Sequence, residues 1–122
     1  MLSVTAEKSS RSINVRMIGH ANFAPAGQDI VCAAASIAWT MLRGELEWVR
    51  ENCDFRCTIT HREDDHMCWL KVALPDDGEP DGMIPERIDD CIHMYLMGIQ
   101  QLENIHPECV QLTIKGNIKL AE

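Results

Sequence analysis

The sequence predicts an α+β fold in two layers: a small antiparallel sheet with two helices on one face, in the order ββαββαβ. Short runs of alternating apolar and polar residues predict the strands, and two long stretches with apolar residues at helical spacing predict the helices. Loops rich in Gly, Pro and Asp separate these elements. With 122 residues the chain can bury one core, so we expect a single domain over residues 1–122.

The first half of the chain is predicted to hold a hairpin, a loop and a long helix. Residues 2–6 and 13–18 alternate on either side of a polar turn, which is typical of a β-hairpin. Loop 19–29 has no period. A helical pattern begins at Ile30, directly after Asp29 at the N-cap position, and continues to about Arg43 or as far as Val49. Because this helix is apolar almost all round, we expect it to be buried.

The second half is predicted to hold another hairpin, a loop, a helix and a final strand. Residues 55–62 and 68–74 alternate around an acidic turn. Pro85 then opens a helix that ends before Pro107, and residues 110–114 alternate as the last strand. The apolar face of this second helix comprises Ile88, Ile92, Tyr95, Leu96, Ile99 and Leu102.

Charge and composition exclude several classes of protein. The net charge of −8 disfavours a nucleic-acid-binding protein, because such a protein needs a basic face for phosphates. The N-terminus lacks the apolar core of a secretory signal, and no stretch reaches the ~18 apolar residues of a membrane span. We therefore expect a cytoplasmic protein with no membrane contact and no direct nucleic-acid binding. Since the cytosol is reducing, the six cysteines are predicted to be thiols.

One polar stripe interrupts the apolar surface of the first helix. Asp29, Cys32, Ser36 and Thr40 recur at spacings of three and four residues, which predicts that they line a cleft or a hydrogen-bonded seam. Cys32 lies in the first turn, where free backbone N–H groups and the helix dipole favour a thiolate, although the charge of Asp29 opposes this. A nearby protonated histidine would favour the thiolate further, and His20 is the nearest histidine in the chain. A His–Cys pair at a helix start is typical of cysteine nucleophiles, whereas a lone Cys among small residues is more often core packing.

The same region carries a resemblance to a known family. The matching block runs from Gly19-His20-Ala21 through Ala24-Pro25 to Gly27-Gln28-Asp29-Ile30-Val31-Cys32-Ala33-Ala34, with Ser36 two residues further on. In this block, and in Gly98-Ile99 and Pro107-Glu108 near the end, the chain resembles the ribosomal-processing cysteine protease family, Prp. The resemblance covers nearly the whole chain.

The resemblance implies an activity, a site and partners. It implies a cysteine endopeptidase that removes a short N-terminal extension from a large-subunit ribosomal protein, without a cofactor. His20 and Cys32 correspond to the catalytic dyad of the family, and Asp29 and Ser36 match supporting positions. The resemblance also implies a homodimer and a mobile loop between His20 and Cys32. The expected partners are therefore a ribosomal protein precursor and a second copy of the chain.

This interpretation gives each residue a role. Cys32 attacks the scissile carbonyl as a thiolate, and His20 holds the proton and donates it to the leaving amine. Backbone N–H groups at the helix start near Cys32 are the expected oxyanion donors. Gly19 and Gly27 are expected to act as hinges of the loop.

Asp29 has two possible roles. The simpler one is to cap the helix by accepting a hydrogen bond from the N–H of Val31 or Cys32. The other is to orient His20.

Two other interpretations remain open: a catalytically silent dimeric binding or scaffold protein of the same fold, and a zinc-binding module. Cys53, Cys57, His61 and His66 have the right chemistry for zinc. However, four residues of a strand span ~13 Å, so Cys53 and Cys57 do not reach one ion if both lie in the predicted strand. We therefore predict no metal, leave Cys53 unassigned, and expect the remaining cysteines to pack in the core, namely Cys57, Cys68, Cys91 and Cys109.

Overall fold

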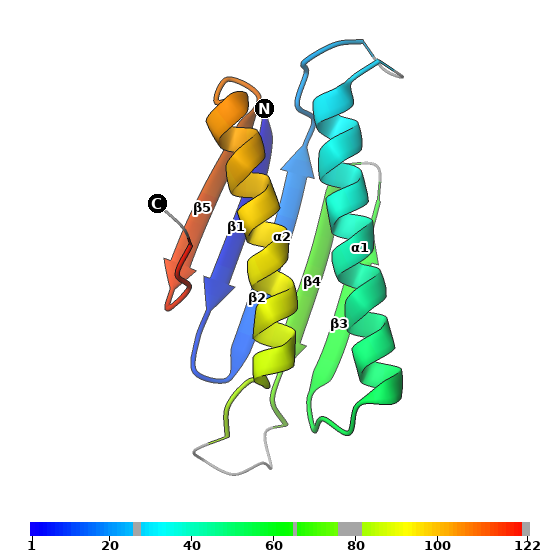
Figure 1. The fold of residues 1–122 in the computed structure, drawn as a ribbon, viewed down its shortest axis with the longest axis vertical. Helices are drawn as coiled ribbons and strands as arrows, with labels where there is room; N and C mark the ends of the chain where they lie inside the picture. Colours follow the sequence, from blue (N-terminus) through cyan, green and yellow to red (C-terminus); the bar gives the residue numbers. More distant parts are fainter. Residues whose placement is uncertain (26–27, 65, 76–81, 121–122) are drawn as a thin grey trace.

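The computed structural model of the protein describes residues 1–25, 28–64, 66–75 and 82–120. The predicted order ββαββαβ is confirmed, and both helices lie on one face of a five-stranded sheet (Figure 1). The elements are β1 (Leu2–Lys8), β2 (Ser12–Gly19), α1 (Ile30–Asn52), β3 (Thr58–Glu63), β4 (Met67–Ala73), α2 (Glu86–Ile105) and β5 (Val110–Gly116). Neither described helix is long and apolar enough to cross a membrane.

The sheet is mostly antiparallel, with strand order β3-β4-β2-β1-β5. The pairs β1–β2, β2–β4 and β3–β4 are antiparallel, whereas β1 and β5 pair in parallel, with Leu2 opposite Val110. The parallel pair follows from the connection between β4 and β5. The helix α2 carries the chain back to the end of the sheet at which β4 began, so β5 runs in the same direction as β4. Since β4 and β1 are both antiparallel to β2, this is also the direction of β1. The α+β class is confirmed, and the helix connection explains the one parallel pair.

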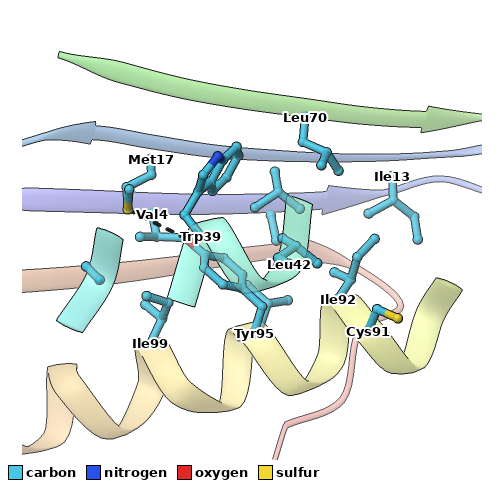
Figure 2. Close-up of a cluster of buried hydrophobic side chains, with 14 of the residues drawn as sticks. Val4, Ile13, Met17, Trp39, Leu42, Leu70, Cys91, Ile92, Tyr95 and Ile99 are labelled. Carbon is cyan, nitrogen blue, oxygen red and sulfur yellow. Dashed lines mark hydrogen bonds between the residues drawn. The ribbon is translucent and has the colours of Figure 1, made fainter. Parts of the chain in front are cut away.

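The core lies between the sheet and the two helices. Alternate residues of the central strands point toward the helices and are fully buried, among them Val4, Val15 and Leu70. Figure 2 shows Trp39 of α1 and Tyr95 of α2 meeting in this layer, with ring centroids 5.8 Å apart at an interplanar angle of 81°. This edge-to-face contact joins the helices over the sheet.

The expectation that α1 is buried all round is wrong. Its buried residues form one face: Val31, Ala35, Trp39, Leu42, Leu46 and Val49. On the opposite face four large apolar side chains are exposed by half or more: Ile30 (66%), Ile37 (59%), Met41 (65%) and Trp48 (52%). The reason is the two-layer architecture, because a helix that lies on a sheet covers only one of its faces.

Two element boundaries differ from the prediction by three residues. The helix α1 continues to Asn52, beyond Val49, and β3 begins at Thr58 rather than at residue 55. The strand starts there because Thr58 pairs with Ala73, the last residue of β4, so earlier residues have no partner in that strand. The predicted apolar face of α2 is confirmed: five of its six residues are buried, and Leu102 packs against the core.

Candidate active site

Three parts of the chain meet at one end of the molecule: loop residues 20–25, the first turn of α1, and the adjoining ends of β3 and β4 (Figure 1). Gly19 ends β2, and its N–H donates to the carbonyl of His66 at 2.9 Å. Gly19 has a φ of +90°, and a Cβ added there would lie 2.7 Å from the carbonyl oxygen of Met1. Glycine is therefore required here for a close backbone approach. The hinge role of Gly19 stays a prediction, and the other predicted hinge, Gly27, lies outside the described residues.

Asp29 joins the loop to the helix. Its Oδ1 accepts from the N–H of Cys32 at 2.9 Å, so it caps α1 as predicted, and its Oδ2 accepts from the N–H of Phe23 at 3.0 Å. The bond from Cys32, followed by the bond from Phe23, lowers the pKa of the Asp29 carboxyl despite some desolvation. Among the described residues, no hydrogen bond joins Asp29 to His20, so its alternative role finds no support in this geometry.

The thiol of Cys32 is held against the loop backbone. Cys32 is half-buried, and its Sγ accepts from the N–H of Ala21 at 3.2 Å. This contact fixes the sulfur against the loop backbone. It also holds the residue next to His20 beside the nucleophile. Within the described part of the chain no hydrogen bond links the His20 ring to Sγ, and such bonds are often long until substrate binds.

Two backbone N–H groups in the first turn of α1 are already hydrogen-bonded and are not free to bind an oxyanion. The N–H of Cys32 already donates to the Asp29 side chain, and the N–H of Ala33 donates to the Asp29 carbonyl at 3.0 Å. Both groups expected to face a reacting carbonyl are therefore occupied in this conformation. An oxyanion would need a donor outside this pair, or a rearrangement of the cap.

Two hollows flank the cysteine and share His20, Cys32 and Ser36. The larger, about 590 Å³, is lined by His20, Asn22, Ala24, Gln28, Asp29, Ile30, Cys32, Ala33 and Ser36. The smaller, about 140 Å³, is lined by Leu2, Met17, Gly19, His20, Cys32, Ala35, Ser36, Asp64, His66, Met67 and Cys68. The first three residues of the predicted polar stripe therefore do line a cleft. The fourth, Thr40, instead donates to the carbonyl of Ser36 at 2.9 Å.

Two aromatic contacts of the site were missed at the level of sequence. The rings of His20 and His66 lie edge to face, with centroids 5.6 Å apart and an interplanar angle of 87°. Phe23 of the loop packs on His106 at the end of α2, with centroids 4.9 Å apart. The sequence contains no local signal for either contact, because each joins segments that only the sheet and helix layers bring together.

The other cysteines differ from Cys32. All six are free thiols. Cys91 and Cys109 are buried, and Cys53, Cys57 and Cys68 are half-buried against the core. Burial raises the pKa of the thiols of Cys57, Cys68 and Cys91, so these groups are poor nucleophiles.

The structure removes one argument against a zinc site but shows no such site among the described residues. Cys53 caps the end of α1 and Cys57 precedes β3, so the premise that both lie in a strand is wrong. Among the residues that the structure describes, no group of three or more His, Cys, Asp or Glu side chains is arranged to hold a metal ion.

A cysteine at a capped helix start, sharing a cleft with a loop histidine on an α+β scaffold, defines a candidate cysteine-protease site. The model of the cysteine protease Prp family matches residues 1–111, and the chain belongs to this family. No curated protein matches the chain.

Solved structures have the same fold. SMU.848 from Streptococcus mutans is 27% identical, with a TM-score of 0.67 and 94% of each chain covered. The essential ribosomal processing protease Prp from S. aureus, solved with a covalently linked product peptide, is 22% identical, with a TM-score of 0.62; the match covers 94% of this chain and all of that one. The same S. aureus protein with a substrate peptide is 21% identical over the same shares, with a TM-score of 0.61. At these identities the likeness to the S. aureus protein concerns the fold.

Proposed function

We propose that this protein is a cytoplasmic cysteine endopeptidase that removes a short N-terminal extension from a large-subunit ribosomal protein. The observation that carries the proposal is the position of Cys32: it lies in the first turn of a capped helix, its Sγ accepts a hydrogen bond from the N–H of Ala21, and it lines both hollows together with His20. Membership of the Prp family and the peptide complexes of the S. aureus protein support the choice of substrate.

The reaction follows from these groups. Cys32 Sγ attacks the scissile carbonyl carbon as a thiolate, and the C–N bond breaks as His20 donates its proton to the leaving amine. Water, deprotonated by His20, then hydrolyses the thioester and regenerates the thiol. Asp29 fixes the first turn of α1 beneath the cysteine, and Ser36 lines the cleft one turn further on.

Cleavage of a precursor tests the proposal. The protein is incubated with a ribosomal protein precursor that carries its N-terminal extension, and the products are mapped by mass. We expect a single cut that Cys32→Ala and His20→Ala each slow by about a thousandfold or more. Cys57→Ala, which removes a half-buried thiol away from the cleft, is the matched control and should cleave at the wild-type rate. Undiminished cleavage by Cys32→Ala would refute the mechanism.

Alkylation separates an enzyme from a silent scaffold. Iodoacetamide should label Cys32 first and well below the pH at which the other thiols react. Cys57, Cys68 and Cys91 should react slowly, because burial raises the pKa of their thiols and leaves less thiolate at a given pH. If the protein is a silent scaffold, all six thiols should be alkylated slowly, and His20→Ala should not change the rate of labelling.

The proposal includes a homodimer formed through α1. The exposed face of α1 follows alternating steps of four and three residues, as in a coiled-coil seam: Ile30, Ala34, Ile37, Met41, Gly44 and Trp48. Met94 of α2, 71% exposed, lines the same groove as Met41. Light scattering should show a dimer that Met41→Glu converts to a monomer. Ile105→Glu, at an exposed position outside this face, should leave the dimer intact, and a wild-type monomer at every concentration would contradict the proposal.

A further inference from the structure

The sheet has a second face, opposite the helices. Figure 1 shows α1 and α2 on the same side, and neither described helix covers the other side. Because side chains alternate along a strand, the residues between the core positions point to this open face. In β4 these include Trp69 and Lys71, whose neighbours Leu70 and Val72 are buried in the core.

Trp69 stands between two arginines. In the strand order β3-β4-β2, Trp69 of β4 is paired directly with Arg16 of β2 on one side and with Arg62 of β3 on the other. Neighbouring strands are ~4.8 Å apart, so the two arginines start ~10 Å from each other with the indole between them. Lys71 lies two residues along β4, ~7 Å away on the same face. We refer to Arg16, Arg62, Trp69 and Lys71 as the sheet platform.

The charge of this face is opposite to that of the whole chain. Among the described residues of the sheet, the open face carries Arg16, Arg62, Lys71 and Lys115 against one carboxylate, Glu7, whereas the net charge of the chain is −8.

None of the three platform cations takes part in an ion pair with a described residue. The charge of Arg62 helps to lower the pKa of the Asp64 carboxyl, but the hydrogen bonds that Asp64 accepts come from the backbone N–H groups of His66 and Met67. Arg16 and Arg62 are exposed, and Trp69 and Lys71 are half-buried. The cations are therefore available to an external anion.

We propose that the sheet platform binds single-stranded RNA, with a base stacked on Trp69 and adjacent phosphates held by Arg16, Arg62 and Lys71. An aromatic residue at the centre of an open sheet, flanked by cations, offers both a stacking surface and phosphate contacts. An acidic peptide would use the cations but carries no base to stack on the indole, and binding of anionic vesicles is an outcome that the test below separates from RNA binding. The choice of RNA rests on the proposed function, because a ribosomal protein precursor acts beside RNA.

This proposal departs from the expectation drawn from net charge. Phosphate binding depends on the local field, and a face with four cations attracts an anion even when the rest of the surface is acidic. The acidic remainder weakens the interaction, and the contacts of the cations with phosphates make it salt-dependent. The acidic surface also repels RNA, so the protein approaches RNA with the sheet platform facing it.

Fluorescence anisotropy with a labelled single-stranded oligouridylate tests the proposal, using the full-length protein over a series of salt concentrations. Trp69→Ala should raise the Kd by about tenfold, and Trp69→Phe, which keeps a stacking ring, should stay near the wild-type value. The double variant Arg16→Ala/Arg62→Ala should reduce the slope of log K against log salt by about 1.4, since each lost phosphate contact lowers it by ~0.7. Lys119→Ala, which removes one charge away from the platform, should leave the slope unchanged.

The outcomes separate this proposal from the protease proposal. Cys32→Ala should bind the oligouridylate as wild type does, so loss of cleavage and loss of RNA binding are independent results. Absence of binding at low salt would overturn the proposal. So would equal binding of an RNA duplex, an unchanged Kd for Trp69→Ala, or binding of phosphatidylserine vesicles without binding of RNA. A circular dichroism melt of each variant confirms that it is folded.

Discussion

At the scale of single residues, Asp29 connects the nucleophile to its loop. One carboxylate oxygen caps α1 through the N–H of Cys32 and the other holds the N–H of Phe23. Phe23 in turn packs on His106, so the loop is attached both to the start of α1 and to the end of α2. The Asp29 side chain therefore helps to position Cys32, although Asp29 makes no hydrogen bond to Ala21, the residue whose N–H donates to the sulfur.

Substitution of Asp29 should destabilise the protein in a pH-dependent way. The folded-state pKa of Asp29 lies below its ordinary value of 3.8, so the charged carboxylate contributes stability that is complete above that value and is lost as the pH falls through the folded pKa. We expect Asp29→Asn to unfold at lower denaturant than wild type at neutral pH, and the difference to shrink below pH 3.8.

Asp29→Ala is the matched comparison, because Asn retains a capping oxygen and Ala does not. Denaturant titrations should therefore rank wild type, Asn and Ala in decreasing stability at neutral pH. Equal stability of the Asn and Ala variants would show that a neutral capping oxygen contributes nothing and that only the charge of Asp29 stabilises the fold.

At the scale of elements, one histidine attaches the edge strand β3 to α1. His61 Nε2 lies 3.0 Å from Glu47 of α1, and its Nδ1 lies 3.0 Å from Glu63 of β3. Glu63 also accepts from Trp39 Nε1 at 3.2 Å and pairs with Arg43 Nε at 3.3 Å. A neutral imidazole donates from one of its nitrogens and a protonated one from both, whereas the Trp39 and Arg43 contacts of Glu63 do not depend on the charge of His61.

Glu63→Gln should weaken this attachment at neutral pH and have no effect in acid. Partial burial alone would raise the pKa of Glu63, but hydrogen bonds from His61 and Trp39 and the charges of His61 and Arg43 lower it below 4.5. The stabilisation is thus complete above pH 4.5 and disappears as the pH falls through the folded pKa. Because these pairs are partly solvated, the loss should be about 1 kcal/mol or less.

Urea titration measures this loss, with Glu51→Gln at the exposed end of α1 as the control. A loss that persists in acid would assign the effect to packing rather than to charge.

Two glycines should respond oppositely to alanine. Gly19→Ala places a Cβ 2.7 Å from the Met1 carbonyl at a φ of +90°, so it should lower the melting temperature. Gly44 lies inside α1 with nothing of its own chain within 4 Å of an added Cβ, so in the monomeric Met41→Glu variant Gly44→Ala should stabilise the helix by about 0.5–1 kcal/mol. Thermal unfolding followed by circular dichroism compares the two, and equal shifts would contradict the assignment.

At the scale of the whole molecule, the net charge of −8 should accelerate the capture of a basic substrate segment. We expect kcat/KM for a basic precursor to fall as salt is added, because screening shortens the range of the attraction. An uncharged substrate peptide with the same cleavage site is the control and should show no such decline. Salt-independent cleavage of the basic precursor would exclude steering.

Local sequence was sufficient for much of the fold and for part of the site. The alternation in β1, β2 and β4, the apolar face of α2 and the cap at Asp29 each depend on residues close together in the chain, and the structure confirms them. The resemblance in the Gly19 to Cys32 block led to the Prp family, which the family match confirms. The roles of His20 and Cys32 within that block stay predictions.

The exposed face of α1, the parallel pairing of β1 with β5 and the contact of His66 with His20 required the tertiary structure. So did the separation of charge that gathers Arg16, Arg62 and Lys71 on one face of an acidic protein. The physical reason is the same in each case. Backbone preferences act over a few residues, and the sequence alone determined them, whereas burial, pairing and local field depend on which distant segments the sheet and helix layers bring together.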